Sequence, residues 1–289
     1  MKKKIIALCL AAVIAVTAIA SVTLAYLTDT DEAENVFTMG NVKIQQLEYE
    51  RVKDENGAKT NEIQLFTNNQ KVFPAVYDIP GTPGKTPLTV NGSEFQIRNF
   101  PNYVDKMVCV GNVGNSDAYV RVIVAVPVNP NESAEDNDVS ENWLHFNYIT
   151  DTDTSVRNGW CVGTPENKIE WDNDLSKHYV VQNVEIEGKL YDLTVFTNIL
   201  PLAPSQETAP CMTGFYLDND LNCDENGWYM PCNDEDGKFY VAEANEDMLA
   251  ENLILVATQA VQTEGFADAW QAFAASFGEI TEENHPWAN

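Results

Sequence analysis

Alternating hydrophobic and polar positions recur along much of this chain and predict β-strands. The clearest alternation spans residues 118–126, with one face made of Val120, Val122, Val124 and Val126 and the other of Tyr119, Arg121 and Ile123. Residues 181–186 and 190–196 flank the turn Glu187-Gly188-Lys189 and predict a hairpin. Residues 253–261 are apolar almost without interruption, which favours a strand buried on both faces.

The first core strand is predicted to begin at Val42, and its pattern is irregular. Val42 and Ile44 alternate with polar residues, whereas Leu47 and Tyr49 continue the alternation one residue out of phase. We therefore expect a β-bulge near Gln45-Gln46.

Two long polar segments, 51–94 and 129–180, are rich in turn-forming residues, and we interpret both as inserted loops between core strands. Short strands are expected inside the first one, at 63–66 and 71–76. Arg121, on the predicted strand 118–126, is either an anion ligand or a side chain that extends from the outer face of a sheet into solvent, and we favour the second interpretation.

One helix is predicted near the end of the sequence, over residues 265–277. Its apolar stripe recurs at steps of four, three and four, and Gly278 is a stop signal; the stripe is Phe266, Trp270, Phe273 and Phe277. Such a stripe usually packs on a sheet. The pattern as a whole predicts an all-β fold, a single antiparallel β-sandwich domain over residues 26–289 with decorating insertions and one C-terminal amphipathic helix.

Residues 1–25 have the composition of a signal peptide. Lys2-Lys3-Lys4 precede an apolar run from Ile5 to Leu24 that ends in small residues. Cleavage is possible after Ala20, or between Ala25 and Tyr26. The run is also long enough, at about 20 residues, to cross a bilayer as an uncleaved anchor. Its alanine content and cleavable end favour a signal peptide, and hence a secreted protein.

The chain is strongly acidic, with 44 Asp and Glu against 17 Lys and Arg and a formal net charge of −27. Loss of the leader removes three lysines and makes the mature chain more acidic. Phosphate groups and anionic lipids repel such a chain, so we expect no nucleic-acid partner and no membrane contact after cleavage. Calcium, a basic partner or simple solubility in a salty medium fits this charge.

Five cysteines remain after cleavage, so at least one cannot pair within the chain. Export permits disulfides. The best local candidate is Cys223 with Cys232, because Asn226-Gly227 between them is a turn signal.

The region around the second cleavage site resembles the TasA/camelysin family, whose members leave Gram-positive cells through the signal peptidase SipW. That family has the pattern A-(aromatic)-x-(S/T)-D, an acidic spacer, then N-x-F-x-x-G-x-(V/L)-x-(I/L). The matching residues are Ala25, Tyr26, Thr28, Asp29, Asn35, Phe37, Gly40, Val42 and Ile44. The resemblance favours cleavage between Ala25 and Tyr26.

Three later stretches are also similar to motifs of that family. Residues 110–122 are similar to (V/I)-x-N-x-G-(T/S)-x-x-A-Y-V-R-(V/I), with Asn115 in place of the Thr or Ser, and residues 260–266 match A-(I/V)-Q-x-x-G-F. Residues 200–208 are similar to L-x-P-G-(E/Q)-T, with Ala203-Pro204-Ser205 displacing the glycine. The resemblance implies a jelly-roll sandwich, and a secreted subunit of an extracellular or biofilm matrix that associates with itself or with other matrix proteins.

A physical route to such assembly is strand addition, because an open sandwich has sheet edges with unpaired backbone groups. The segment 26–37 is expected to be a flexible start of the mature chain and a possible donor strand. Its candidate pocket-filling residues are Tyr26, Leu27, Val36 and Phe37.

Candidate chemistry is sparse. Alternating oxygen ligands in 218–227 make a weak calcium candidate, formed by Asp218, Asp220, Asn222 and Asp224, although the glycine and glutamate of an EF-hand are absent. We expect no other cofactor. No HExxH, G-x-S-x-G or phosphate-loop motif occurs.

Two alternatives to a structural subunit stay open. Camelysin-like relatives are classed as metallopeptidases, so one alternative is a secreted metal-dependent endopeptidase that uses His145 and His178. The other alternative is a surface adhesin or binding module.

Overall fold

The structure is a computed structural model of the 289-residue chain. It describes residues 42–76, 84–128, 143–148, 159–162, 181–231, 237–243 and 254–288, and the backbone of 36–39. The segment 26–35, with Tyr26 and Leu27, and the leader lie outside the described residues.

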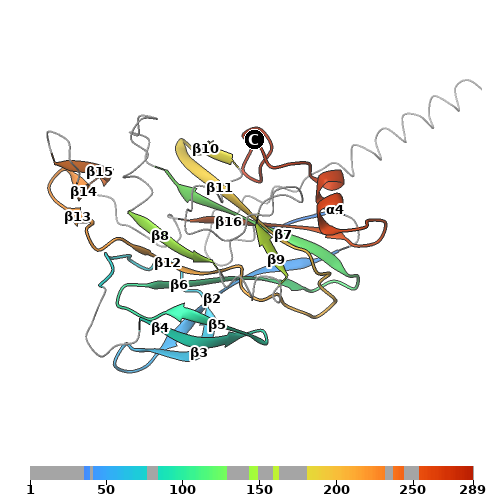
Figure 1. The fold of residues 1–289 in the computed structure, drawn as a ribbon, viewed down its shortest axis with the longest axis horizontal. Helices are drawn as coiled ribbons and strands as arrows, with labels where there is room; N and C mark the ends of the chain where they lie inside the picture. Colours follow the sequence, from blue (N-terminus) through green and yellow to red (C-terminus); the bar gives the residue numbers. More distant parts are fainter. Residues whose placement is uncertain are drawn as a thin grey trace, which may run out of the picture.

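Two main sheets form the body of the protein (Figure 1). Sheet A has the strand order β1-β16-β7-β11-β10, with β9 also paired to β11; its strands are β1 (Val36–Met39), β7 (Ala118–Pro127), β9 (Trp160–Val162), β10 (Val181–Ile186), β11 (Lys189–Asn198) and β16 (Leu255–Gln262). Sheet B has the order β3-β2-β6-β12-β8; its strands are β2 (Ile44–Lys53), β3 (Lys59–Leu65), β6 (Val104–Asn112), β8 (Leu144–Tyr148) and β12 (Met212–Leu217).

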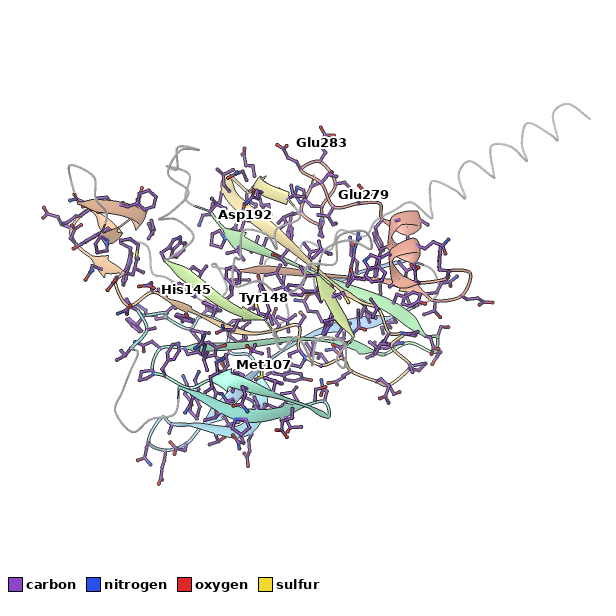
Figure 2. The ribbon with its side chains drawn as sticks, viewed as in Figure 1. Met107, His145, Tyr148, Asp192, Glu279 and Glu283 are labelled. Atoms are coloured by element: carbon purple, nitrogen blue, oxygen red, sulfur yellow. The ribbon has the colours of Figure 1, made fainter. Side chains whose placement is uncertain are left out.

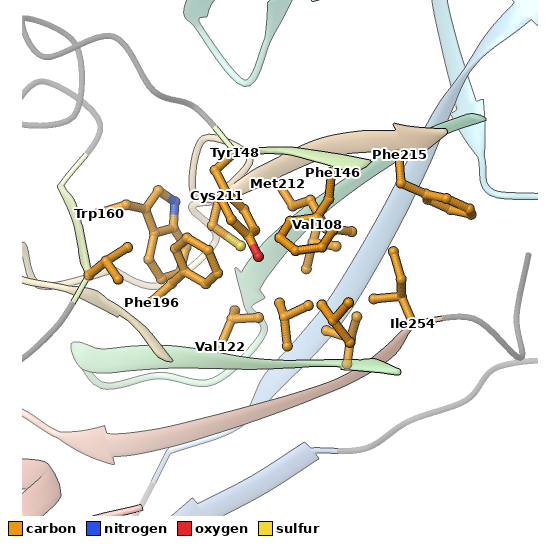
Figure 3. Packing of buried hydrophobic residues seen from close by; sticks show 14 of the residues in the cluster. Val108, Val122, Phe146, Tyr148, Trp160, Phe196, Cys211, Met212, Phe215 and Ile254 are labelled. Atoms are coloured by element: carbon orange, nitrogen blue, oxygen red, sulfur yellow. The ribbon is translucent and has the colours of Figure 1, made fainter. Parts of the chain in front are cut away.

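The core lies between the inner faces of these sheets, which confirms the predicted β-sandwich. The four valines predicted to share a face of the strand at 118–126 all lie in this core. Figure 3 shows Val122 on one side of the core and Phe146, Met212 and Phe215 on the other. The two faces meet because alternation places every second side chain of each strand on the same side.

Further elements cover the outer faces of the sandwich. A hairpin of β4 (Lys85–Val90) and β5 (Ser93–Arg98) packs Leu88 and Ile97 against Met107 of β6 (Figure 2). The helix α4 (Ala269–Ser276) packs on the outer face of sheet A, as expected for its apolar stripe. A small sheet of β13 (Asn222–Cys223), β14 (Gly227–Pro231) and β15 (Lys238–Glu243) lies far from α4 in Figure 1.

The expected β-bulge near Gln45-Gln46 is wrong. β2 pairs with β6 in unbroken register from Ile44 opposite Asn112 to Tyr49 opposite Met107. The pattern changes phase because both faces of β2 are covered: Ile44 points into the core between the sheets, whereas Leu47 points toward the β4–β5 hairpin. A strand buried on both faces does not show simple alternation.

Other boundaries also differ from expectation. Residues 51–94 hold the end of β2, all of β3 and β4 and the start of β5, and therefore have more regular structure than expected. Residues 71–76 contribute isolated bridge residues, Lys71 and Pro74, the latter opposite Leu217, instead of a strand. The helix begins four residues later than predicted, because Asp268 caps it by accepting a hydrogen bond from the backbone of Gln271.

Candidate assembly site

β1 occupies the outer edge of sheet A, where it runs parallel to β16. The register places Val36 opposite Thr258 and Met39 opposite Val261. On its other side β16 pairs with β7 along its whole length. Among the described residues, no strand pairs with the outer edge of β16 at 255–257. A strand that adds to this edge would pair through the backbone groups of β16.

Two other sheet edges, β10 and β3, are less suited to strand addition. In β10 the register shifts between Val181 and Val184, and Asn183 has a left-handed φ of 57° while its N–H donates to Asp192 Oδ1 over 2.8 Å. Such a bulge makes an edge strand less able to pair with another strand. β3 exposes the polar side chains of Asn61, Glu62 and Gln64 beside Leu65. β16, by contrast, is mostly apolar and pairs with β7 without a register shift.

The junction from β1 to β2 crosses from sheet A to sheet B. It is held by the end of β6 and the loop that follows, residues 111–117, together called the 111–117 turn below. The N–H of Val113 donates to the carbonyl of Lys43 over 3.0 Å. A Cβ added at Gly114 would lie 2.8 Å from the backbone N of Lys43, so only glycine allows this close approach. Beside β1, the Thr258 hydroxyl donates to Gln46 Oε1 over 2.8 Å and links the two sheets.

Asn112 organises this end of the sandwich. Its Nδ2 donates to the carbonyls of Leu202 over 2.7 Å and Ser116 over 2.9 Å, and its Oδ1 accepts from the N–H of Gly114 over 3.0 Å. The residue is buried. One amide therefore joins the 111–117 turn to the segment 199–208 that leads from sheet A to sheet B.

The segment 199–208, called the strap below, pairs with the ends of β6 and β7. Leu202 exchanges backbone hydrogen bonds with Ala118, and the Thr208 hydroxyl accepts from the N–H of Val110 over 3.0 Å. Ser205 has a φ of 63°, in the left-handed region that favours glycine. It thus takes the conformation that the displaced glycine of the family pattern would adopt more easily.

The described parts of the four stretches that resemble the family motifs therefore meet at one end of the molecule. Residues 42–44 contact the 111–117 turn, the strap pairs with that turn, and the N–H of Thr263 donates to the carbonyl of Asp117 over 3.2 Å. The sequence singled out these stretches separately, but only the fold brings them together around the β1–β2 junction.

Arg121 is not a solvent-exposed side chain, contrary to expectation, because α4 covers it. Its Nε donates to Gln259 Oε1 over 2.5 Å, and its guanidinium lies 4.7 Å from the centre of the Phe273 ring. The guanidinium also approaches the carbonyl of Gly278, at the C-terminal end of α4, where the helix dipole is negative. Burial lowers the pKa of Arg121 to about 10.

The four calcium candidates mostly bond to their own turns. Asp218 accepts from the N–H of Asp220 over 2.8 Å and contacts His145, and Asn222 donates to the carbonyl of Asp220 over 2.7 Å. Asp224 accepts from Lys238 over 2.5 Å, and this bond chiefly lowers the pKa of Asp224 to about 2. In the part of the chain that the structure describes, no group of three or more His, Cys, Asp or Glu side chains is placed to hold a metal ion. Calcium binding stays a prediction.

The cysteine prediction is also untested. The β13–β14 hairpin forms around Asn226-Gly227 as expected, with Cys223 opposite Trp228. Cys223 is an exposed free thiol, and Cys232 lies outside the described residues.

The structure does not test whether the two histidines proposed for an endopeptidase, His145 and His178, come together. His145 lies on β8 (Figure 2). Its Nε2 lies 2.7 Å from Asp218 Oδ2, and its ring stacks on Tyr216 with 4.8 Å between centroids. His178 lies outside the described residues. The structure thus supplies a His–Asp pair but no test of the enzymatic alternative.

Sequence reasoning missed a buried charge cluster on the outer face of sheet B. Asp105 accepts from Arg51 Nε over 2.8 Å and from Lys59 Nζ over 2.7 Å. Burial lowers the pKa of Lys59 to about 8, although Asp105 opposes this shift. Burial alone would raise the pKa of Asp105, but hydrogen bonds from Arg51 and the charge of Lys59 outweigh it and hold the pKa below its usual value. The sequence signal that could have predicted this cluster is Asp105, an acidic residue within a mostly apolar strand.

No protein-family model and no curated protein matches this chain. No helix in the described part of the chain has the length and apolar character needed to span a membrane. The functional argument therefore depends on the geometry of the β1–β16 edge.

Proposed function

We propose that this protein is a secreted structural subunit of an extracellular matrix, similar in kind to the TasA/camelysin proteins, which associates with itself by exchanging its N-terminal strand. The observation that carries the proposal is the parallel pairing of β1 with the outer edge of β16. Val36 and Phe37, two of the predicted donor residues, belong to this strand. Export through SipW, cleavage between Ala25 and Tyr26 and an extracellular location form part of the same proposal.

Exchange would be thermodynamically inexpensive because it conserves contacts. In the single chain β1 completes its own sheet A, and in an assembly the β1 of one copy would complete the sheet A of another through the same register. The hydrogen bonds lost and gained are alike, so the balance depends on the junction, the protein concentration and the repulsion between copies.

Charge is the main barrier to association. A chain with a net charge of −27 repels a second copy, and this repulsion keeps the free form soluble. Acid protonates carboxylates and calcium screens them. We therefore expect assembly to increase when the pH falls or when calcium is added.

The experiment compares the mature chain, Tyr26–Asn289, with two deletions, of residues 26–35 and 26–39. Light scattering and electron microscopy would follow assembly across acid pH and added calcium. We expect ordered polymers from the mature chain and none after deletion of 26–39, which removes β1. Polymers that are unchanged by both deletions would show that the N-terminal segment is not the donor.

A point substitution separates strand pairing from loss of chain length. Phe37→Pro and Thr38→Pro affect adjacent residues of β1, and one of the two removes an N–H that faces β16. One of these variants should lose assembly while the sandwich stays folded. Full assembly by both would contradict pairing through β1.

A further inference from the structure

The end of the sandwich next to the β1–β2 junction carries an unusual surface for so acidic a chain. We define the end face as the turn residues 111–116 and the strap residues 199–206, which hydrogen-bond to each other. Neither segment contains a charged residue, in a protein of net charge −27. Val113 is 51% exposed and Leu200 is 50% exposed. This is an uncharged and partly apolar surface on a polyanion.

The position of β1 ties this surface to the proposed strand exchange. β1 runs in the same direction as β16, so Met39, opposite Val261, ends at the same end of the sandwich as the 111–117 turn. β2 starts there too, with Ile44 opposite Asn112. The chain therefore leaves one sheet and enters the other beside the end face.

The reach of the chain then fixes how two exchanging copies sit. After exchange, Met39 lies against the end face of the partner copy while Ile44 stays at the end face of its own. Five residue steps separate Met39 from Ile44, and these span at most about 17 Å. The two end faces must therefore lie within this distance of each other, in a closed pair and equally in an open chain of copies.

On this basis, and resting on the proposed function, we infer that the end face is the contact surface between exchanging copies of this chain. Its occupant is the end face of a second copy. An uncharged patch is the part of a polyanion that a like copy can approach with least repulsion, and the half-exposed Val113 and Leu200 supply apolar area to bury. At its rim, the exposed Lys43 of one copy can face the exposed Asp117 or Glu207 of the other.

The test introduces charge on the end face without touching β1. The variant Val113→Glu/Leu200→Glu changes two half-exposed side chains, and the control Leu65→Glu changes a side chain that is 62% exposed on β3. Circular dichroism and thermal melting would establish that all three proteins fold. We expect the double variant to raise the concentration needed for half-assembly about tenfold or more, because carboxylates meet across the contact, and the control to assemble like the unmodified chain.

A second variant distinguishes the contact from general loss of solubility or fold. Six Gly/Ser residues inserted between Asn41 and Val42 lengthen the junction, so that exchange no longer forces the end faces together. This insertion should restore assembly to the charged double variant. Unchanged assembly of the double variant, or failure of the insertion to restore it in a folded protein, would overturn the inference.

Strand exchange is measured separately, so that the two proposals fail in different ways. Cysteines at the register pair Val36→Cys/Thr258→Cys would report whether β1 lies on its own β16 or on that of another copy. Cross-links between copies together with wild-type assembly of the charged variant would reject the end-face contact alone. Absence of cross-links between copies in assembled protein would reject strand exchange itself.

Discussion

The β1–β2 junction is tightest at Gly114, and Gly114→Ala is the most informative single substitution. The added Cβ would lie 2.8 Å from the backbone N of Lys43 and 3.3 Å from its carbonyl oxygen. Ordinary van der Waals contact begins near 3.4 Å, and a backbone atom cannot rotate away. Gly114 itself has no left-handed φ, so the alanine is resisted by this contact and not by its own conformation.

Overpacking of this kind costs about 1–3 kcal/mol. The strain falls on Lys43, the last residue before β2. We expect exchange to relieve it, because exchange draws the residues before Ile44 toward the partner copy. The same free energy should therefore raise the equilibrium constant for strand exchange by about 5- to 150-fold for each junction that opens. Urea denaturation would measure the loss of stability. Formation of disulfide-linked copies by the Val36→Cys/Thr258→Cys pair would measure exchange.

Gly84→Ala is the matched control, because a Cβ at Gly84 meets no atom within 4 Å and its φ is not left-handed. This control should be as stable as the unmodified chain, or slightly more stable, and should exchange at the same rate. If Gly114→Ala lowers stability without increasing exchange, the turn supports the fold but does not govern the junction. If neither quantity changes, the close contact between Gly114 and Lys43 does not restrain the junction.

Three other predictions follow from the buried contacts. Asp105→Asn leaves Arg51 and Lys59 without their counter-charge and should cost about 3–5 kcal/mol in urea denaturation, whereas Glu62→Gln on exposed β3 should cost little. The pKa of Lys59 is about 8 in the folded protein and 10.5 when unperturbed, so between these pH values the unfolded chain binds more protons than the folded one. The free energy of unfolding should therefore rise by up to about 3 kcal/mol from pH 8 to 10.5, measured relative to Lys59→Met at the same pH. Arg121→Met should speed hydrogen exchange of the α4 amides while leaving β7 protected, and equal protection of α4 in both proteins would contradict its role as a helix anchor.

The local patterns in the sequence were sufficient for the sandwich and for its strongest strands. The predicted strand at 118–126 corresponds to β7, and the hairpin at Glu187-Gly188 joins β10 to β11. The helix was found from its spacing of aromatic residues. These elements are determined by residues close together in sequence, whose periodicity shows directly which face is buried.

The features that depend on distant residues were not predictable. Nothing in the sequence shows that Val36–Met39 pairs in parallel with β16, more than two hundred residues later. The polar residues of 51–94 concealed a hairpin that covers sheet B, because its apolar positions alternate over short strands only. Arg121 was misplaced for the same reason: its cover, α4, comes from another part of the chain. The motif stretches could be recognised individually, while their contacts around Asn112 became visible only in the fold.

The measurement that tests the central claim most directly is the disulfide pattern of the Val36→Cys/Thr258→Cys protein, oxidised before and after assembly and separated on non-reducing gels. The single variant Val36→Cys serves as the background for the native cysteines. Strand exchange requires a disulfide within one chain in the monomer and a ladder of linked chains in the polymer, with reduction releasing single chains. A polymer whose chains carry only internal Val36→Cys/Thr258→Cys disulfides would show that β1 never leaves its own sheet, and would contradict assembly by strand exchange.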